Sequence, residues 1–281
     1  MPTTRPYRSV LYIPAANARA MEKAQGLAAD AIIFDLEDAV APAEKAAARD
    51  LLRAALANDY GKRARIVRIN GLDTDWGADD ARAFASGADA VLIPKVSRPQ
   101  DLDAVAALVP ETPLWAMMET AEGMLNAAAI AAHPRLQGMV MGTNDLAKEL
   151  NSRFRADRLP MMAGLGLCLL AAKAQGKVIV DGVYNAFKDE DGLRAECDQG
   201  RDMGFDGKTL IHPAQLAVTN AAFAPSGAEV DLARRQIAAF EQAQAGGKGV
   251  AVVDGRIVEN LHIVTARALL AKADAIAALE G

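Results

Sequence analysis

The feature that most constrains the fold is a rhythm of short apolar runs, each followed by a segment with helical spacing. The clearest runs cover residues 10–13, 31–34, 90–93 and 178–181, and several are rich in β-branched side chains. Such runs suit parallel strands that are buried on both faces. Eight strand–helix units follow one another as far as Ala222, without a break in composition. The rhythm predicts an α/β fold with a single (β/α)₈ barrel, whereas a doubly wound sheet would more usually have fewer strands.

The last part of the chain does not fit a ninth unit. It contains a charged helical segment at 229–245, a glycine-rich stretch at 246–249, a hairpin-like arm at 250–255 and a final helical segment at 264–279. We therefore expect a catalytic barrel domain at residues 1–224 and a C-terminal helical lid or oligomerisation segment at residues 225–281.

Charge and composition exclude several classes of protein. The 281 residues carry a formal net charge of -5 and no basic block, which argues against nucleic-acid binding. No apolar run is long enough to span a bilayer, and the N-terminus has no apolar signal core. Cys168 and Cys197 lack metal-binding or redox spacing, so we interpret them as buried thiols in a reducing compartment. These observations predict a soluble cytoplasmic protein with no nucleic-acid or membrane partner.

Two acids stand at the ends of apolar runs. Glu119 lies near the end of the run at 113–120, and Asp145 closes the run at 138–145. For either acid alone, a role at the start of a helix is as good an interpretation as a chemical one. Because the carboxyl ends of barrel strands converge on one mouth, the pair could share one hard cation. Mg²⁺ needs only one or two protein carboxylates besides waters and substrate oxygens, so the pair favours a magnesium site.

Other polar residues also fall at the predicted carboxyl ends of strands. They are Asp35, Glu37, Asp38, Arg68, Asn70, Lys95, Asp181 and His212. In a barrel these ends meet at the same mouth, so we expect the whole set to surround one site.

Three members of this set allow both a chemical and a structural interpretation. The planar fork of Arg68 matches a carboxylate or an enolate, but an ion pair with Glu37 or Asp38 would explain it too. Lys95 could form a Schiff base, although a structural or substrate-steering role is more economical beside a metal. For His212, a structural hydrogen bond is at least as suitable as catalysis.

Basic residues follow two of the predicted strands. Arg19 and Lys23 are four positions apart, so they share one face of the helix after the first strand and could hold phosphates at the rim. Arg153, Arg155 and Arg158 form a similar cluster after the sixth strand. The alternative for both groups is an ordinary solvated surface.

Several segments, in order along nearly the whole chain, resemble the citrate lyase β-subunit-like family, also called HpcH/HpaI aldolase/citrate lyase. The matching segments are RSVLYIP at 8–14, DLEDAVAP at 35–42, VRIN at 67–70, IPK at 93–95, ETAEG at 119–123, DLA at 145–147 and GKTLIHPAQ at 207–215. The family includes malyl-CoA, methylmalyl-CoA and citramalyl-CoA lyases and malyl-CoA thioesterases.

The resemblance implies a TIM barrel of the phosphoenolpyruvate/pyruvate superfamily that acts on acyl-CoA. It implies a Mg²⁺ cofactor, with Mn²⁺ able to substitute, held by Glu119 and Asp145. It assigns substrate contact to Arg68 and the CoA phosphates to Arg19 and Lys23. It also implies a homotrimer or homohexamer in which the C-terminal lid closes over a neighbouring subunit's site.

The lid segment departs from the family pattern in one place. Many relatives have Asp before a small apolar-Pro turn, where this chain has Glu259 followed by Asn260 and no proline. We expect Glu259 to enter the adjacent subunit's site as an acid or base, with Asp254 as the second choice.

We expect a Mg²⁺-dependent carbon–carbon lyase that cleaves a β-hydroxyacyl-CoA such as malyl-CoA, or a methylated homologue, into acetyl-CoA and glyoxylate. Arg68 would stabilise the enolate, and an acid, Glu37 or Glu259, would move the proton. The same residues would serve a (3S)-malyl-CoA thioesterase, so they do not separate the two activities. A citrate lyase β subunit acting on a carrier-bound citryl group and a silent acyl-CoA-binding protein are further alternatives.

Overall fold

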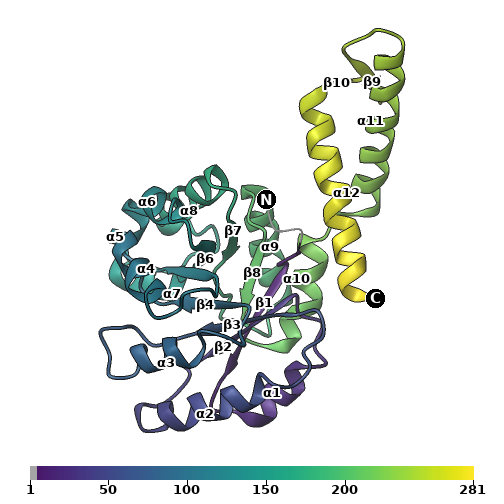
Figure 1. Ribbon diagram of the computed structural model, residues 1–281. Helices are drawn as coiled ribbons and strands as arrows, with labels where there is room; N and C mark the ends of the chain where they lie inside the picture. The colour runs from purple at the N-terminus through teal and green to yellow at the C-terminus, as the bar shows by residue number, and fades with distance from the viewer. Residues whose placement is uncertain (1–4) are drawn as a thin grey trace. The chain divides into compact units, whose positions relative to one another are not determined.

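Eight parallel strands form a closed barrel in the computed structural model, which describes residues 5–281 (Figure 1). The strands are β1 (Ser9–Pro14), β2 (Ala31–Asp35), β3 (Ala64–Arg68), β4 (Ala90–Ile93), β5 (Leu114–Met118), β6 (Leu136–Met141), β7 (Val178–Asp181) and β8 (Gly207–Leu210). Each strand pairs with the next one along the chain, and β8 pairs with β1 to close the ring. The predicted TIM barrel is confirmed.

Helices follow the strands in the alternation that the sequence predicts. They are α1 (Ala18–Ala24), α2 (Lys45–Ala55), α3 (Gly77–Ala83), α4 (Pro99–Ala106), α5 (Ala121–Leu125), α6 (Ala127–Ala131), α7 (Thr143–Glu149), α8 (Met162–Ala174), α9 (Glu190–Met203) and α10 (Leu216–Phe223). Short 3-10 turns η1 (Pro42–Glu44), η2 (Leu159–Met161) and η3 (Pro213–Gln215) precede α2, α8 and α10.

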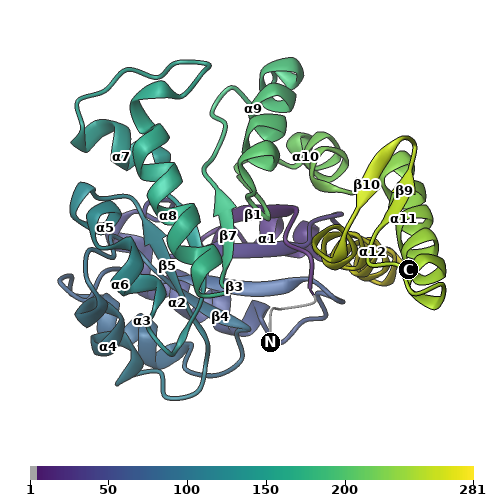
Figure 2. The same cartoon turned by 90° about the horizontal axis from the view of Figure 1, so that it is seen from above.

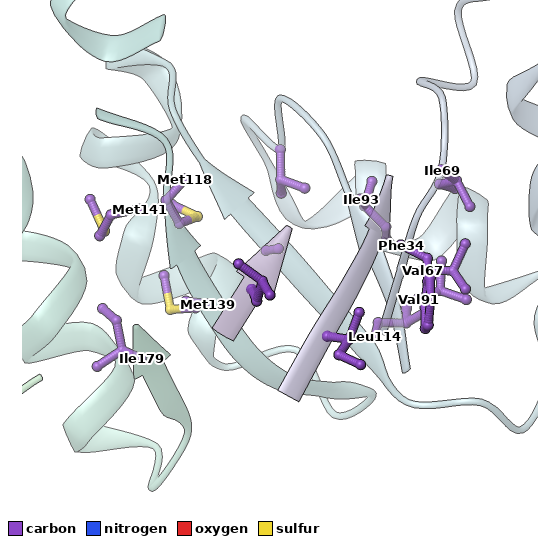
Figure 3. Close-up of a cluster of buried hydrophobic side chains, with 14 of the residues drawn as sticks. Phe34, Val67, Ile69, Val91, Ile93, Leu114, Met118, Met139, Met141 and Ile179 are labelled. Atoms are coloured by element: carbon purple, nitrogen blue, oxygen red, sulfur yellow. The ribbon is translucent and has the colours of Figure 1, made fainter. Parts of the chain in front are cut away.

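The strands divide the apolar side chains between two cores because neighbouring residues point to opposite faces. The inner core fills the barrel with residues such as Ile33, Ile66 and Trp115. The outer core lies between the strands and the helices. Figure 3 shows part of it, where Phe34 and Val67, paired across β2 and β3, lie side by side.

Both cysteines belong to the outer core, as the sequence predicts. Cys168 on α8 and Cys197 on α9 are free and have no exposed surface. Burial raises the pKa of both thiols, that of Cys168 to about 12. Among the described residues, no helix has the length and apolar character needed to cross a membrane.

The described chain divides into two units, one of Tyr7–Phe223 and one of Ala224–Gly281 together with Arg5 and Pro6. In the second unit, the long helices α11 (Gly227–Ala245) and α12 (Asn260–Glu280) run side by side (Figures 1 and 2). The short antiparallel strands β9 (Ala251–Val253) and β10 (Arg256–Val258) join them. Phe240, Val258 and Ile263 form the centre of a separate small core.

The last helix begins earlier than the sequence predicts. We expected it to start at 264, but it starts at Asn260. The reason is a cap: the ring nitrogen Nδ1 of His262 accepts a hydrogen bond from the backbone N–H of Glu259 at 3.0 Å. The cap satisfies a backbone donor at the helix start.

Candidate active site

A cavity of about 380 Å³, which we call the mouth cavity, opens at the carboxyl ends of the barrel strands. Its floor is largely apolar and includes Tyr12, Met117 and Met141, while carboxylates and a guanidinium stand around it. The described residues that line it are Tyr12, Pro14, Asp35, Asp38, Ala39, Arg68, Met117, Glu119, Met141–Asp145, Val183 and Ile211. An apolar cavity with a few convergent polar groups is the usual form of a small-molecule site.

The strand periodicity explains why these side chains meet. Asp35 and Arg68 are the last residues of β2 and β3, and they follow the inward-facing Ile33 and Ile66 by two positions. Glu119 follows the inward-facing Met117 of β5 in the same way. Because the side-chain period of a strand is two, all three point toward the mouth cavity.

Arg68 is the centre of a buried charge network. Its Nε and Nη2 donate to the two carboxylate oxygens of Asp35 at 2.7 and 2.6 Å. Its Nη1 lies 2.9 Å from Oε2 of Glu37, and its guanidinium lies 5.1 Å from the centroid of the Tyr12 ring. Although burial acts in the opposite direction, the Asp35 carboxylate raises the pKa of Arg68 well above its usual value. Arg68 is therefore a fixed cation at the cavity wall.

The structure corrects one detail of the Arg68 interpretation. We expected Glu37 or Asp38 as its ion-pair partner, but the bidentate partner is Asp35. Glu37 forms the second contact, and Asp38 is more distant at 3.6 Å. Asp35 takes this place because its inward position on β2 is paired in register with Arg68 on β3.

Glu119 occupies a cradle that only glycine leaves open. A Cβ atom on Gly142 would lie 2.4 Å from Oε2 of Glu119, so any larger residue there would displace the carboxylate. The other oxygen, Oε1, accepts the backbone N–H of Lys95 at 2.8 Å. Burial, reinforced by the nearby Glu37 carboxylate, raises the pKa of Glu119 to about 8. A carboxylate in this position is stabilised by a cation beside it.

Asp145 faces the same cavity from a different kind of element. We expected it at the end of a strand, but β6 ends at Met141 and Asp145 lies in the first turn of α7. An acid is favourable there because the helix N-terminus carries a partial positive charge. Asp145 still lines the mouth cavity together with Glu119.

The donor set of the mouth cavity fits a hard divalent cation. Glu119 and Asp145 offer carboxylate oxygens, and no cysteine or histidine occurs among the described residues that line the cavity. No group of three or more His, Cys, Asp or Glu residues in the described part of the chain is arranged to hold a metal. Mg²⁺ does not require such a group, because it keeps several waters and takes one or two carboxylates plus substrate oxygens.

Glu37 and Lys95 form a second ion pair behind the mouth cavity. The Lys95 ammonium lies 3.0 Å from Oε1 of Glu37, which raises the pKa of Lys95. Burial raises the pKa of Glu37, while Arg68 opposes this shift. A lysine that is stabilised as a cation is a poor Schiff-base nucleophile, so the structure favours the positioning role for Lys95.

The structure also describes the two predicted CoA-binding residues. Arg19 and Lys23 are exposed on α1, and Asn17 caps this helix by accepting from the backbone N–H of Ala20 at 3.0 Å. Because α1 follows directly after β1, Arg19 lies near the end of the barrel that carries the mouth cavity. Their contact with phosphates stays a prediction.

Asp181 was wrongly expected at the mouth. It follows the inward-facing Val180 of β7, so its side chain points outward, under the helices. There it accepts from Nη1 of Arg158 at 2.8 and 2.7 Å and lies 3.2 Å from the Lys208 ammonium. Arg158 is buried, so it is no rim cation, whereas Arg155 pairs with Asp157 at the surface.

His212 has the structural role that the sequence allowed. Its Nδ1 accepts from the backbone N–H of Ala214 at 3.1 Å, which caps the turn η3. Its ring stacks on Phe187 with 4.5 Å between the centroids. Neither interaction involves the lining of the mouth cavity.

The two candidate lid acids both belong to the second unit. Asp254 lies in the turn between β9 and β10, with φ of 50°, and pairs with Arg235 at 2.7 Å. Glu259 is exposed and directly precedes α12. The part of either acid in catalysis stays a prediction.

Two residues of the site were missed at the level of sequence. Tyr12 stacks on Arg68, and its inward position on β1, two residues after Val10, was the available signal. Gly142 was read only as part of an apolar run, because nothing in the sequence reveals that it makes room for Glu119.

A closed parallel barrel with an acidic, oxygen-rich mouth defines the class of this protein as a TIM-barrel enzyme. The family model described as HpcH/HpaI aldolase/citrate lyase matches residues 8–213, and the chain belongs to this family. The resemblance noted in the sequence is thus confirmed.

Three similar proteins bear on the function of this chain. The chain is 76% identical to a (3S)-malyl-CoA thioesterase of Cereibacter sphaeroides, over 97% of this chain and 96% of that protein. It is 33% identical to an L-malyl-CoA/beta-methylmalyl-CoA lyase of the same species, over 99% and 98% of the two chains. Among solved structures, protein CitE of Mycobacterium tuberculosis in complex with magnesium, acetoacetate and coenzyme A aligns with a TM-score of 0.82. Its sequence is 32% identical, and the alignment covers 97% of this chain and 100% of that one.

These similarities overturn the expected carbon–carbon lyase. The chain is far more similar to a thioesterase, which is a hydrolase, than to the malyl-CoA lyase. The error arose because the residues that the sequence analysis expected to bind the metal and the substrate would serve either reaction. The chain is an enzyme of the HpcH/HpaI family, and its CitE relative binds magnesium and coenzyme A.

Proposed function

We propose that this protein is a (3S)-malyl-CoA thioesterase, which hydrolyses its substrate to malate and free CoA. The observation that carries the proposal is the 76% identity to a thioesterase of this specificity over 97% of the chain. The mouth cavity supports it, because it combines an apolar floor with oxygen donors and a fixed cation. The citrate lyase β alternative lacks support of this strength.

Glu119 and Asp145 would hold one Mg²⁺, or Mn²⁺ in its place. When bound, such an ion acts as a Lewis acid toward the substrate oxygens that it contacts. The protein contributes the geometry: Gly142 leaves room for Glu119, and the Lys95 backbone N–H fixes its other oxygen.

Arg68 would bind the negative charge that develops on the thioester oxygen, or the free carboxylate of the malyl group. Two of its five N–H groups bind Asp35 and Nη1 also contacts Glu37, which leaves part of the guanidinium for the substrate at the cavity wall. Because the Asp35 contact and the Tyr12 ring hold the guanidinium in place, little reorganisation is needed when charge appears.

Glu37 is our candidate base. Its carboxylate contacts Arg68 and Lys95, which orient it behind the mouth cavity. Arg19 and Lys23, exposed at the start of the barrel's first helix, would bind the phosphates of the CoA group.

We also propose a homotrimer or homohexamer in which Glu259 acts in a neighbouring site. Large apolar side chains on the barrel unit support the assembly, because Leu125 and Leu170 are 81% and 71% exposed. A contiguous exposed apolar patch is typical of a surface that a partner covers. Light scattering of the purified protein distinguishes these assemblies from a monomer.

The decisive experiment is incubation of the protein with malyl-CoA, with and without Mg²⁺. Malate and free CoA without acetyl-CoA are the expected products. Acetyl-CoA and glyoxylate would show carbon–carbon cleavage, and no turnover with Mg²⁺ would contradict the proposal. Condensation of acetyl-CoA with glyoxylate is the control for the reverse lyase reaction.

A further inference from the structure

A second cavity, which we call the side cavity, lies next to the mouth cavity. Its volume is about 450 Å³, and its lining comes from the loops after β3 and β4 and from α4. It is polar, with Asn70, Thr74 and Ser97 among its lining residues. Its volume is sufficient for several water molecules, and its polar groups can hold them.

Two contacts join the lining of the side cavity to the lining of the mouth cavity. Glu37 and Lys95 line the side cavity. Glu37 touches Arg68 of the mouth cavity at 2.9 Å, and the Lys95 backbone donates to Glu119 of the mouth cavity at 2.8 Å. Glu37 and Lys95, which we call the wall, therefore line the side cavity and contact residues that line the mouth cavity.

One carboxylate oxygen of this wall has no hydrogen bond from the described residues. Oε2 of Glu37 is fully buried and accepts no hydrogen bond from any described residue, although Arg68 lies near it. The whole residue is only 8% exposed. Buried carboxylate oxygens are normally hydrogen-bonded to protein or to ordered water, so this oxygen, whose partner is the Arg68 ion pair, can accept a further hydrogen bond from a water.

Lys95 has the properties of a movable element in the wall. Its side chain is 57% exposed and reaches back to Glu37 across the side cavity. Its backbone adopts a left-handed conformation, with φ of 52°, which is uncommon for a residue with a side chain. Such strain is retained where the surrounding structure enforces it, often at functional sites.

We propose that the side cavity supplies the hydrolytic water to the thioester and that the Lys95 side chain gates this route. The inference rests on the proposed thioesterase function, because only hydrolysis needs a water molecule as a reactant. The side cavity offers water several polar partners, and its wall residues contact Arg68 and Glu119 of the mouth cavity.

The chemical step balances with the groups described. The water oxygen forms a bond to the thioester carbonyl carbon, and one water proton passes to the Glu37 carboxylate. The carbon–sulfur bond then breaks, and its electron pair leaves with sulfur. The proton on Glu37 passes to the CoA thiolate, and the new carboxyl group loses its proton to solvent, so that malate and CoA thiol are the products.

The first test fills the side cavity. Ala104 on α4 is exposed and lines it, so Ala104→Trp should obstruct the route without disturbing the fold. We expect kcat for malyl-CoA hydrolysis to fall by about tenfold with KM little changed, because substrate binding in the mouth cavity is untouched. Ala104→Leu should have a smaller effect of the same kind.

The matched control is Ala107→Trp, which places the same side chain at the exposed end of α4, outside the lining of both cavities. It should keep the wild-type kcat. A wild-type kcat in both Ala104 variants would mean that water enters through the mouth cavity, which overturns the proposal.

The second test removes the Lys95 side chain. Lys95→Ala should admit a larger nucleophile, so hydrolysis in the presence of methanol should yield several-fold more methyl malate relative to malate than the wild type does. An unchanged product ratio would contradict the gate. If the wild-type protein instead forms no malate from malyl-CoA, the proposed function itself fails, and that outcome is separate from any effect of Ala104 or Lys95.

Discussion

At the scale of a single residue, Arg68 has a structural role and, in the proposed function, a chemical one. Its bidentate contact with Asp35 is one that lysine cannot reproduce, because an ammonium has no planar fork. We expect Arg68→Lys to reduce kcat/KM by roughly 10²–10³, the range for a lost oxyanion donor. Malate formation from malyl-CoA is the measurement.

The control for this variant is Arg49→Lys. Arg49 also donates to a buried carboxylate, that of Asp80 at 2.6 Å, but it does not line the mouth cavity. Its replacement should lower the melting temperature and leave kcat/KM near the wild-type value. Equal catalytic losses in the two variants would mean that Arg68 acts only as a structural ion pair.

Gly142 gives a second prediction at this scale. In Gly142→Ala the added methyl group would stand 2.4 Å from Oε2 of Glu119, so the carboxylate must move away. We expect Mg²⁺ binding, measured by calorimetry, to weaken by about tenfold or more, as when a metal ligand is misplaced. Gly166→Ala on α8 is the control, because a Cβ there meets no atom within 4 Å. Unchanged Mg²⁺ affinity in Gly142→Ala would remove Glu119 from the metal site.

The raised pKa of Glu119 gives a pH dependence that can be measured without substrate. Metal binding requires the deprotonated carboxylate, and burial raises the pKa of Glu119 to about 8. Mg²⁺ affinity should therefore rise about tenfold per pH unit as pH increases toward 8 and become constant above it. In the metal-free protein, folding binds a proton on this group between its unfolded pKa and 8, so stability should fall as pH rises through that window. A Mg²⁺ affinity that does not change between pH 6 and 8 would contradict this assignment.

At the scale of the strand, the side-chain period decides which acids reach the site. Asp35 and Glu119 lie two positions after inward-facing residues, whereas Asp181 lies one position after Val180 and points outward. The sequence indicates that each acid closes a strand, but the strand end alone does not reveal the face. Alternation along a run that is apolar on both faces carries no visible signal, which explains why Asp181 was misplaced.

The buried cluster of Asp181, Arg158 and Lys208 supports a prediction about stability. Asp181 is fully buried and paired with Arg158 and Lys208, whose positive charges lower its pKa against the effect of burial. Asp181→Asn leaves the two buried cations with only the Glu196 carboxylate, which lies 2.5 Å from the Lys208 ammonium and 3.9 Å from Arg158. We therefore expect a loss of roughly 3–5 kcal/mol of unfolding free energy in urea denaturation. Because the pKa of Asp181 is lowered in the folded protein, this contribution should be fully present above the unfolded pKa. It should be lost as pH falls from there through the lower folded pKa.

The exposed pair Arg155–Asp157 is the natural comparison for Asp181. Asp157→Asn should change the unfolding midpoint little, because water already solvates both charges. Similar losses of unfolding free energy in Asp157→Asn and Asp181→Asn would show that burial does not set the strength of the Asp181 ion pairs.

At the scale of the whole molecule, the second unit carries the acid that departs from the family pattern. Residue order places Glu259 between the β9–β10 hairpin and α12, which are stabilised by a core of their own. The barrel and most of its mouth were predictable because strand rhythm and family motifs run through the barrel segment. The part of Glu259 in catalysis was not predictable, because its proposed action in a neighbouring subunit would depend on contacts that no local pattern encodes.

Subunit mixing tests the proposed action of Glu259 between subunits. Glu259→Ala and Asp145→Asn should each be nearly inactive, but for different reasons, and Glu259→Ala should still bind Mg²⁺. If one subunit supplies the metal site and its neighbour supplies Glu259, mixed oligomers will contain some sites with neither defect, and activity will return. No recovery after proven subunit exchange would show that Glu259 acts within its own chain or has no chemical part.

The two buried cysteines have a practical consequence for the proposed chemistry. Cys168 and Cys197 have no exposed surface, and burial keeps both thiols in the unreactive protonated form. The folded protein should therefore react very little with a water-soluble thiol reagent. Each CoA that it releases would carry a fully accessible thiol. The enzyme would neither consume the reagent nor form mixed disulfides with its own product, so CoA release could be followed continuously at high protein concentration.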